Sequence, residues 1–170
     1  MYQDPALPAL PDSTLPAFRF PFTSGEGAFS TEQLGEKPHL LIVFTPEDCS
    51  VCFSEIPFWE RLQATFGDRV NVVGIVSGHP AEKSTAFLKR RKINIPVAVD
   101  PEGRMLDFLQ LRNTGLTPVK VFVDPSGRVW HVARTTYANA LAQLRYARAL
   151  HTLLGQSETR DRRYRARLPE

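Results

Sequence analysis

The 170-residue sequence has no apolar run that approaches the roughly 20 residues needed to span a bilayer. Its longest candidate is HLLIVF, residues 39–44. The N-terminus also lacks a basic segment followed by an apolar stretch, which is typical of a secretory signal. As it stands, the chain is therefore expected to be cytoplasmic. It would be extracytoplasmic if Met1 followed an anchor that had been removed.

Cysteine is scarce. Cys49 and Cys52 are the only two, and both lie in the stretch TPEDCSVCFSEIP, residues 45–57. A structural zinc site needs four ligands, but the chain has no second cysteine pair and its four histidines are scattered. A structural disulfide that closes so small a loop would constrain the unfolded chain little. The pattern therefore favours a redox-active pair over a metal site or a structural disulfide.

The net positive charge comes from one end of the chain. The net charge is +3, and residues 160–170 contain five arginines against two acidic residues, which accounts for all of it. A charged terminal segment is usually a solvated tail. No basic surface interspersed with aromatic residues is evident elsewhere, so no nucleic-acid partner is expected.

Length and composition predict one globular domain flanked by two short segments. The hydrophobic content of 42% and the charged content of 23% are ordinary for a soluble protein. Five prolines between Pro5 and Pro21 exclude a helix at the N-terminus. We expect a proline-rich lead-in over residues 1–14, a domain over residues 15–155 and an arginine-rich tail over residues 156–170.

The spacing of apolar residues predicts alternating strands and helices. Apolar runs predict strands over residues 17–22, 39–45, 69–77, 96–100, 118–124 and 128–134. Helical spacing predicts helices over residues 52–67, 79–93, 102–113 and 139–155, with one helical turn over 30–36. Because a β-α-β order requires parallel pairing and the last two strands form a hairpin, we predict a mixed sheet in an α/β fold with helices on both faces.

The last predicted helix is expected to end at Gly155. Its apolar stripe is expected to consist of four leucines, Leu141, Leu144, Leu150 and Leu154.

The cysteine pair lies where a buried strand is predicted to end and a helix to begin. The unpaired N–H groups and partial positive charge of a helix N-terminus stabilise a thiolate, so the pKa of Cys49 should lie below the value of about 8.5 for a free thiol. Cys52 follows one helical turn later. Cys49 is therefore predicted to be the nucleophile and Cys52 the resolving thiol that breaks the mixed disulfide.

The residues CSVCFSEIP resemble the pattern C-x-x-C-x-x-E-x-P of thioredoxin-like thiol–disulfide oxidoreductases of the TlpA/ResA type, which are related to the AhpC/TSA redoxins. The later stretch GLTPVKVFVDPSGRVWHV resembles that family's cis-proline, strand, D-x-x-G turn and final strand. The resemblance covers roughly residues 15–155. It implies a thioredoxin-like fold with an N-terminal extension and a central β-α insertion formed by the helix near 80–93 and the strand 96–100.

The resemblance also implies a set of site residues. Thr117 and Pro118 would form the cis peptide bond beside the disulfide and contact substrate. Two positions depart from the family: Asp48 replaces the usual tryptophan before the first cysteine, and Val43 occupies the position of an acid on the preceding strand. Asp48 would oppose a thiolate at Cys49. Glu55 would substitute as the proton acceptor, or it would be a solvated helix charge.

The function predicted from these motifs is that of an enzyme, a thiol–disulfide oxidoreductase that needs no cofactor or metal. Its expected partners are protein dithiol or disulfide substrates and a second protein that recycles it.

Two alternatives use the same fold. A copper chaperone would bind metal through Cys49, Cys52 and His131. Such chaperones have the pattern C-x-x-x-C, however, which is one residue longer than the cysteine pair of this chain. A thiol peroxidase would have its cysteine seven residues after Pro46, where this chain has Phe53.

Overall fold

The computed structural model describes residues 13–46, 50–115, 118–134, 137 and 139–165. The chain divides into two compact units, residues 1–136 and 137–170. Among the described residues, none of the helices is both long enough and apolar enough to cross a bilayer.

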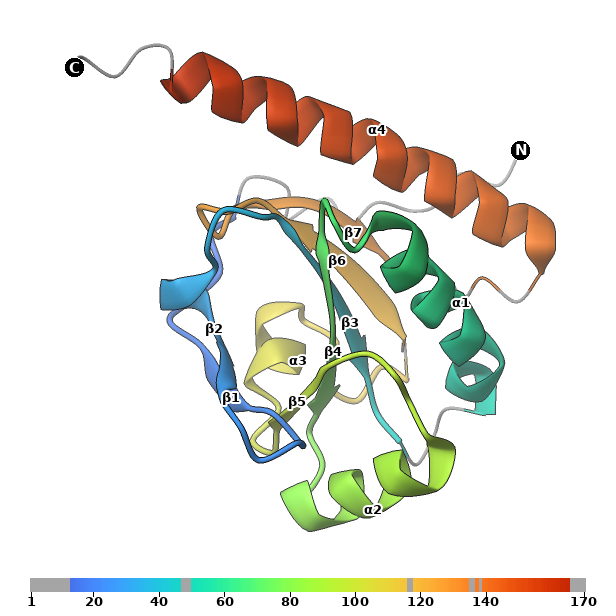
Figure 1. The fold of residues 1–170 in the computed structure, drawn as a ribbon. Coiled ribbons are helices and arrows are strands. Elements are labelled where there is room, and N and C mark those ends of the chain that lie inside the picture. Colours follow the sequence, from blue (N-terminus) through green and yellow to red (C-terminus); the bar gives the residue numbers. More distant parts are fainter. Residues whose placement is uncertain (1–12, 47–49, 116–117, 135–136, 138, 166–170) are drawn as a thin grey trace. The chain divides into compact units, whose positions relative to one another are not determined.

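The first unit is built on a five-stranded sheet with the strand order β5-β4-β3-β6-β7 (Figure 1). Its strands are β3 (His39–Phe44), β4 (Asn71–Ser77), β5 (Val97–Asp100), β6 (Val119–Val123) and β7 (Val129–Ala133). β4 pairs in parallel with both β3 and β5, whereas β6 is antiparallel to β3 and β7. This confirms the predicted mixed sheet.

The central strand β3 explains why the sheet is covered on both sides. All six of its residues are buried, as expected of an apolar strand inside a parallel sheet. Leu41 and Val43 belong to the core cluster on one face. Since side chains alternate along a strand, Phe44 points to the other face, where its ring lies 5.1 Å from that of Trp59.

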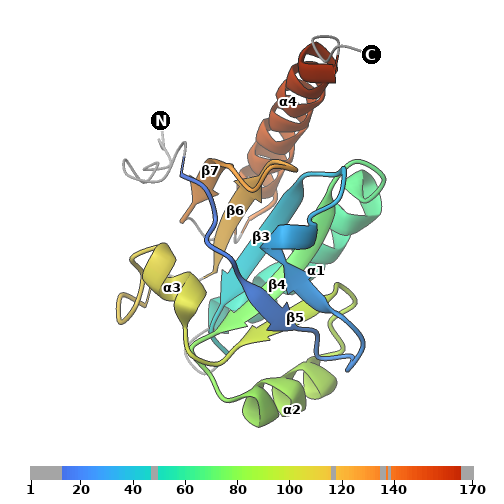
Figure 2. The ribbon, with the colours of Figure 1, turned by 90° about the vertical axis from the view of Figure 1, so that its left-hand side faces the viewer.

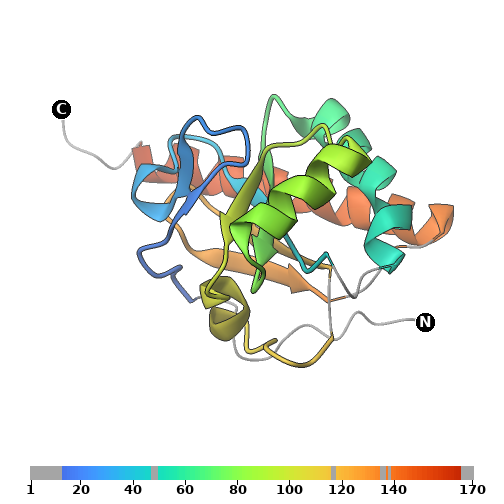
Figure 3. The ribbon, with the colours of Figure 1, turned by 90° about the horizontal axis from the view of Figure 1, so that it is seen from below.

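Helices lie on both faces of the sheet, as predicted. Helices α1 (Ser50–Phe66) and α2 (Ala81–Arg91) lie on one side, and α3 (Arg104–Phe108) lies on the other (Figure 1). Figure 3 shows the strands between α1 and α3. The helix α1 therefore connects the end of β3 to the start of β4 across one face.

A small ribbon precedes the sheet in the sequence. The strands β1 (Arg19–Pro21) and β2 (Ala28–Ser30) pair with each other and lie with α3 in front of the sheet in Figure 2. A 3-10 turn, η1 (Thr31–Gln33), follows where a helical turn was predicted. The sequence did not predict β2. The predicted strand near residues 17–22 is present, but it belongs to this separate ribbon, which an isolated bridge between Phe22 and Ala98 links to β5.

In the second unit, the helix α4 (Ala140–Arg165) is longer than predicted. The expected end at Gly155 is wrong, because the helix continues through it, although glycine costs about 1 kcal/mol inside a helix. The expected leucine stripe is also wrong: Leu141 and Leu144 are 57% and 49% exposed. At 3.6 residues per turn, Leu141 and Leu150 lie about half a turn apart around the helix. The buried stripe is instead Tyr146, Leu150, Leu154 and Ser157.

Candidate active site

The cysteine motif lies at the predicted junction between a buried strand and a helix. β3 ends at Phe44 and α1 begins at Ser50, and residues 47–49 lie outside the described part of the chain. Cys52 is the third residue of α1. Its side chain has 0% exposed surface, and its sulfur is disulfide-bonded. The nucleophile assigned from the sequence, Cys49, is among the residues that the structure does not describe, so its role stays a prediction.

Glu55 lies one helical turn after Cys52 and is fully buried. Its Oε1 accepts a hydrogen bond of 3.0 Å from Trp59 Nε1, one turn further along α1. The same oxygen forms an ion pair with Nζ of Lys120. The alternative of a solvated helix charge is therefore wrong for Glu55. Since residues three apart on a helix are neighbours, Cys52 and Glu55 share one face of α1.

Lys120 is the residue that the sequence analysis missed. It lies on β6 and, like Glu55, has 0% exposed surface. Burial of a charge costs several kcal/mol unless an opposite charge and hydrogen bonds compensate it. The pairing of two buried charges from different elements thus fixes α1 against β6 at this point. A single lysine in the apolar run PVKVFV was the sequence signal that could have identified it.

Pro118 is buried directly before β6, two residues from Lys120. Thr117 lies outside the described residues. The predicted cis peptide bond and the contact of Thr117 and Pro118 with substrate therefore remain predictions. Pro118 thus lies two residues before Lys120, the member of the buried ion pair that β6 contributes.

The structure describes one of the two positions that depart from the family pattern, Val43, and not the other, Asp48. Val43 is fully buried and pairs with Val119 on β6, so this position of β3 is apolar. Asp48 is outside the described residues. Among the described side chains, Glu55 is the carboxylate on α1 nearest in sequence to Cys52, and it is held in the interior by Lys120.

The turn between β6 and β7 has the geometry expected of D-x-x-G. Asp124 Oδ1 accepts hydrogen bonds from the backbone N–H groups of Ser126 and Arg128, at 2.9 and 3.0 Å, and Oδ2 accepts one of 3.0 Å from Trp130 Nε1. Burial alone would raise the pKa of Asp124, but a hydrogen bond from the Ser126 hydroxyl, together with the three just named, outweighs burial and lowers the pKa. Gly127 has φ of +85°, a conformation that favours glycine.

His131 was the proposed third ligand of a copper chaperone. It lies on β7, half-buried, and pairs with Phe122 across the strands. Within the described ranges, no group of three or more His, Cys, Asp or Glu side chains could hold a metal ion. The set of Cys49, Cys52 and His131 includes a residue outside those ranges.

Solved structures share this architecture. A protein of Bacteroides thetaiotaomicron, determined in solution, aligns with a TM-score of 0.70 and 24% identity over 92% of this chain and 96% of that one. A secreted disulfide oxidoreductase of Mycobacterium tuberculosis, homologous to E. coli DsbE, aligns with a TM-score of 0.59 and 25% identity, covering 79% of this chain and 96% of that one. The chain has a thioredoxin-like fold, as its motifs predicted.

The family follows from the sequence comparison. The model of the AhpC/TSA family matches residues 9–132, and the chain belongs to that family. Among curated proteins, it is 28% identical over 115 residues to the thioredoxin-like protein YneN of Bacillus subtilis strain 168. The match covers 66% of this chain and 64% of that protein, so the chain spans less than two thirds of this relative's length.

Proposed function

We propose that this protein is a thiol–disulfide oxidoreductase that exchanges disulfides with protein thiols through Cys49 and Cys52. One observation supports this above the others: Cys52 is disulfide-bonded and fully buried in the first turn of a helix that follows a central strand. A buried second cysteine suits a resolving thiol, because only an adjacent sulfur can reach it.

In the reducing direction, the Cys49 thiolate attacks one sulfur of a substrate disulfide. A Cys49–substrate disulfide forms, and the other substrate sulfur leaves as a thiolate. The Cys52 thiolate then attacks the sulfur of Cys49, which forms the Cys49–Cys52 disulfide and releases the second substrate thiolate. Two electrons pass from the protein to the substrate, and a dithiol partner returns them. With an oxidised protein and a dithiol substrate, the same steps run in reverse.

Glu55 is proposed to accept the proton of Cys52 during the second step. It lies one turn further along the same face of α1 and is buried like Cys52. Lys120 is proposed as a positioning residue that compensates the charge of Glu55 in the interior. Glu55 would thereby take the place of the acid that is absent at Val43.

Reduction of insulin by the protein, with dithiothreitol as the electron source, tests this function. We expect the wild type to accelerate precipitation of the insulin B chain, and we expect Cys49→Ser to reduce the rate to that of dithiothreitol alone. Undiminished activity of Cys49→Ser would contradict the proposal.

The two alternatives are tested alongside. One equivalent of copper retained by the reduced protein through dialysis, and weakened by His131→Ala, would favour the chaperone. Consumption of hydrogen peroxide without insulin reduction would favour the peroxidase. We expect neither result, and we expect His131→Ala to leave thiol exchange intact.

A further inference from the structure

One face of α2 combines apolar and basic side chains. Lys83, Ala86, Phe87, Arg90 and Arg91 follow the spacing of 3, 4, 7 and 8 residues that places side chains on the same side of a helix. Phe87 is buried, whereas Lys83, Arg90 and Arg91 are exposed. The face thus has an apolar centre with cations on both sides along the helix.

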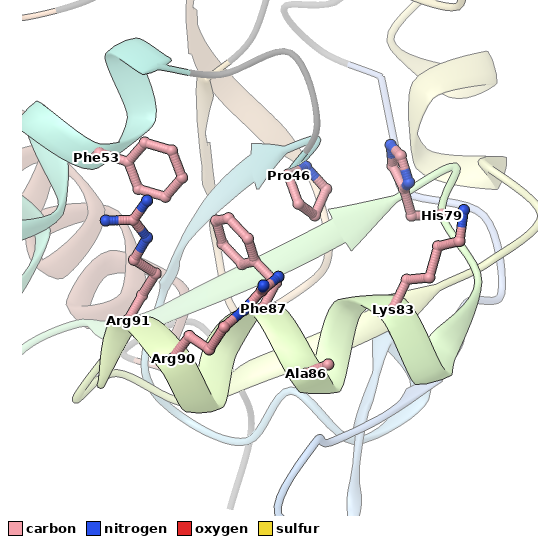
Figure 4. A pocket seen from close by; sticks show the side chains of 8 residues that line it. All are labelled: Pro46, Phe53, His79, Lys83, Ala86, Phe87, Arg90 and Arg91. Atoms are coloured by element: carbon pink, nitrogen blue, oxygen red, sulfur yellow. The ribbon is translucent and has the colours of Figure 1, made fainter.

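This face borders a pocket of about 530 Å³, which is within the range of small-molecule sites. The remaining lining residues are Pro46, Phe53 and His79. Figure 4 shows Pro46 and Phe53 across from α2, with Phe87 directed between them. The rings of Phe53 and Phe87 are 5.2 Å apart, so the two aromatic side chains form a continuous apolar surface.

The rim of the pocket is positively charged. The guanidinium of Arg91 lies 3.7 Å from the ring centre of Phe53. This cation–π contact holds the Arg91 side chain at one end of the pocket. Arg90 lies beside it, and Lys83 lies at the other end near His79 (Figure 4). None of the described lining residues is acidic, and three of them, Lys83, Arg90 and Arg91, are cationic.

The pocket is adjacent in sequence to the redox motif. Pro46 precedes Cys49 by three residues, and Phe53 directly follows Cys52. A protein substrate whose disulfide reaches these cysteines therefore brings its flanking residues toward α2. Arginine and lysine recognise carboxylates, and the Phe53–Phe87 surface suits an apolar side chain.

We propose that this pocket binds an acidic segment next to the reactive cysteine of the protein substrate, with carboxylates on Lys83, Arg90 and Arg91 and an apolar side chain on Phe53 and Phe87. This inference rests on the proposed function and specifies its substrate class. It makes the chain selective for disulfides in negatively charged surroundings.

Binding can be tested without thiol chemistry. The probe is a fluorescent ten-residue peptide with three aspartates and one leucine, in which serine replaces the cysteine; a second peptide has asparagine for aspartate. Fluorescence anisotropy gives the Kd of each. We expect the acidic peptide to bind more tightly, and we expect Arg90→Gln and Lys83→Gln each to weaken it by about fivefold, the upper range for exposed ion pairs.

Lys89→Gln is the matched control, because Lys89 is an exposed cation on α2 that does not line the pocket. It should change the Kd by less than about twofold, since screening limits a charge outside the contact. Equal binding of the two peptides would overturn the proposal. An effect of Lys89→Gln equal to that of Arg90→Gln would overturn it too, because the attraction would then be non-specific.

The cysteine forms of both peptides, as disulfides, then give kcat/KM. We expect the wild type to prefer the acidic disulfide and the Lys83→Gln/Arg90→Gln double variant to lose that preference while it still reduces the neutral one. Reduction of both disulfides at equal rates by the wild type would overturn the docking proposal alone. Selective peptide binding without reduction of either disulfide would overturn the proposed function and leave the pocket supported.

Discussion

The ammonium of Lys120 on β6 and the carboxylate of Glu55 on α1 form an ion pair in which neither side chain has exposed surface. The pair connects the strand that follows Pro118 with the helix that contains Cys52. Two elements of the candidate active site are therefore held together by one interaction between opposite charges in the interior.

Removal of one member of the Glu55–Lys120 pair should destabilise the folded protein. We expect Lys120→Met to lower the free energy of unfolding by about 3–5 kcal/mol, because it leaves the carboxylate of Glu55 buried without a counter-charge. The double variant Glu55→Gln/Lys120→Met removes both charges of the pair and should recover part of that loss. Urea unfolding at pH 7 measures both. Losses that simply add in the double variant would show that the two residues are not coupled.

Glu55→Gln should slow the second chemical step in particular. Without a proton acceptor, Cys52 attacks the mixed disulfide more slowly, by about 100-fold if general-base catalysis is the contribution that is lost. The first attack by Cys49 should change little. Stopped-flow measurement of the two phases separates them, with Glu60→Gln, a half-buried position on the same helix, as control. Equal slowing of both phases would indicate a structural effect only.

Asp124 should make stability depend on pH. Its pKa is lowered in the folded protein, so its contribution is fully present above the unfolded value of about 3.9 and is lost as the pH falls through the lower folded value. We expect Asp124→Asn to cost about 1–3 kcal/mol at pH 7. The difference from the wild type should shrink below pH 4. The control Asp68→Asn, at an exposed position, should change stability by less than about 0.5 kcal/mol at pH 7. A cost for Asp124→Asn that is constant down to pH 2 would contradict this interpretation.

Asp48 precedes the predicted nucleophile in the sequence, and its effect remains a prediction from the sequence. We expect Asp48→Asn to lower the pKa of Cys49 by about one pH unit at most, on the sequence-based expectation that water screens the charge of Asp48. A more stable thiolate would make the pair more oxidising. Titration of thiolate absorbance measures the pKa. If the pKa is unchanged and only stability falls, Asp48 acts as a helix cap.

Much of the sheet could be predicted because continuous runs of branched apolar residues, such as HLLIVF, have few alternatives to a buried strand. The three-residue strand β2 has too short a pattern to recognise. The predicted leucine stripe of α4 was wrong because Leu141 and Leu150 are nine residues apart. At 3.6 residues per turn, their side chains lie on opposite sides of the helix.

The candidate site was only partly predictable. The sequence predicts that Glu55 lies one helical turn after Cys52. It does not predict that Glu55 is buried, because the burial depends on Lys120, which lies 65 positions later in the chain. Similarly, the basic face of α2 is visible in the sequence, whereas its position opposite Phe53 depends on the tertiary structure.

In the proposed mechanism, Cys49 attacks the substrate disulfide and Cys52 resolves the mixed disulfide. Mass spectrometry of the Cys49→Ser and Cys52→Ser variants, each reduced and then mixed with a disulfide-containing peptide substrate, tests it directly. We predict that Cys52→Ser accumulates a covalent adduct on Cys49 with the mass of one substrate half, and that Cys49→Ser accumulates none, since Cys52 is buried. Accumulation of the adduct on Cys52 of the Cys49→Ser variant, with none on Cys52→Ser, would contradict the account.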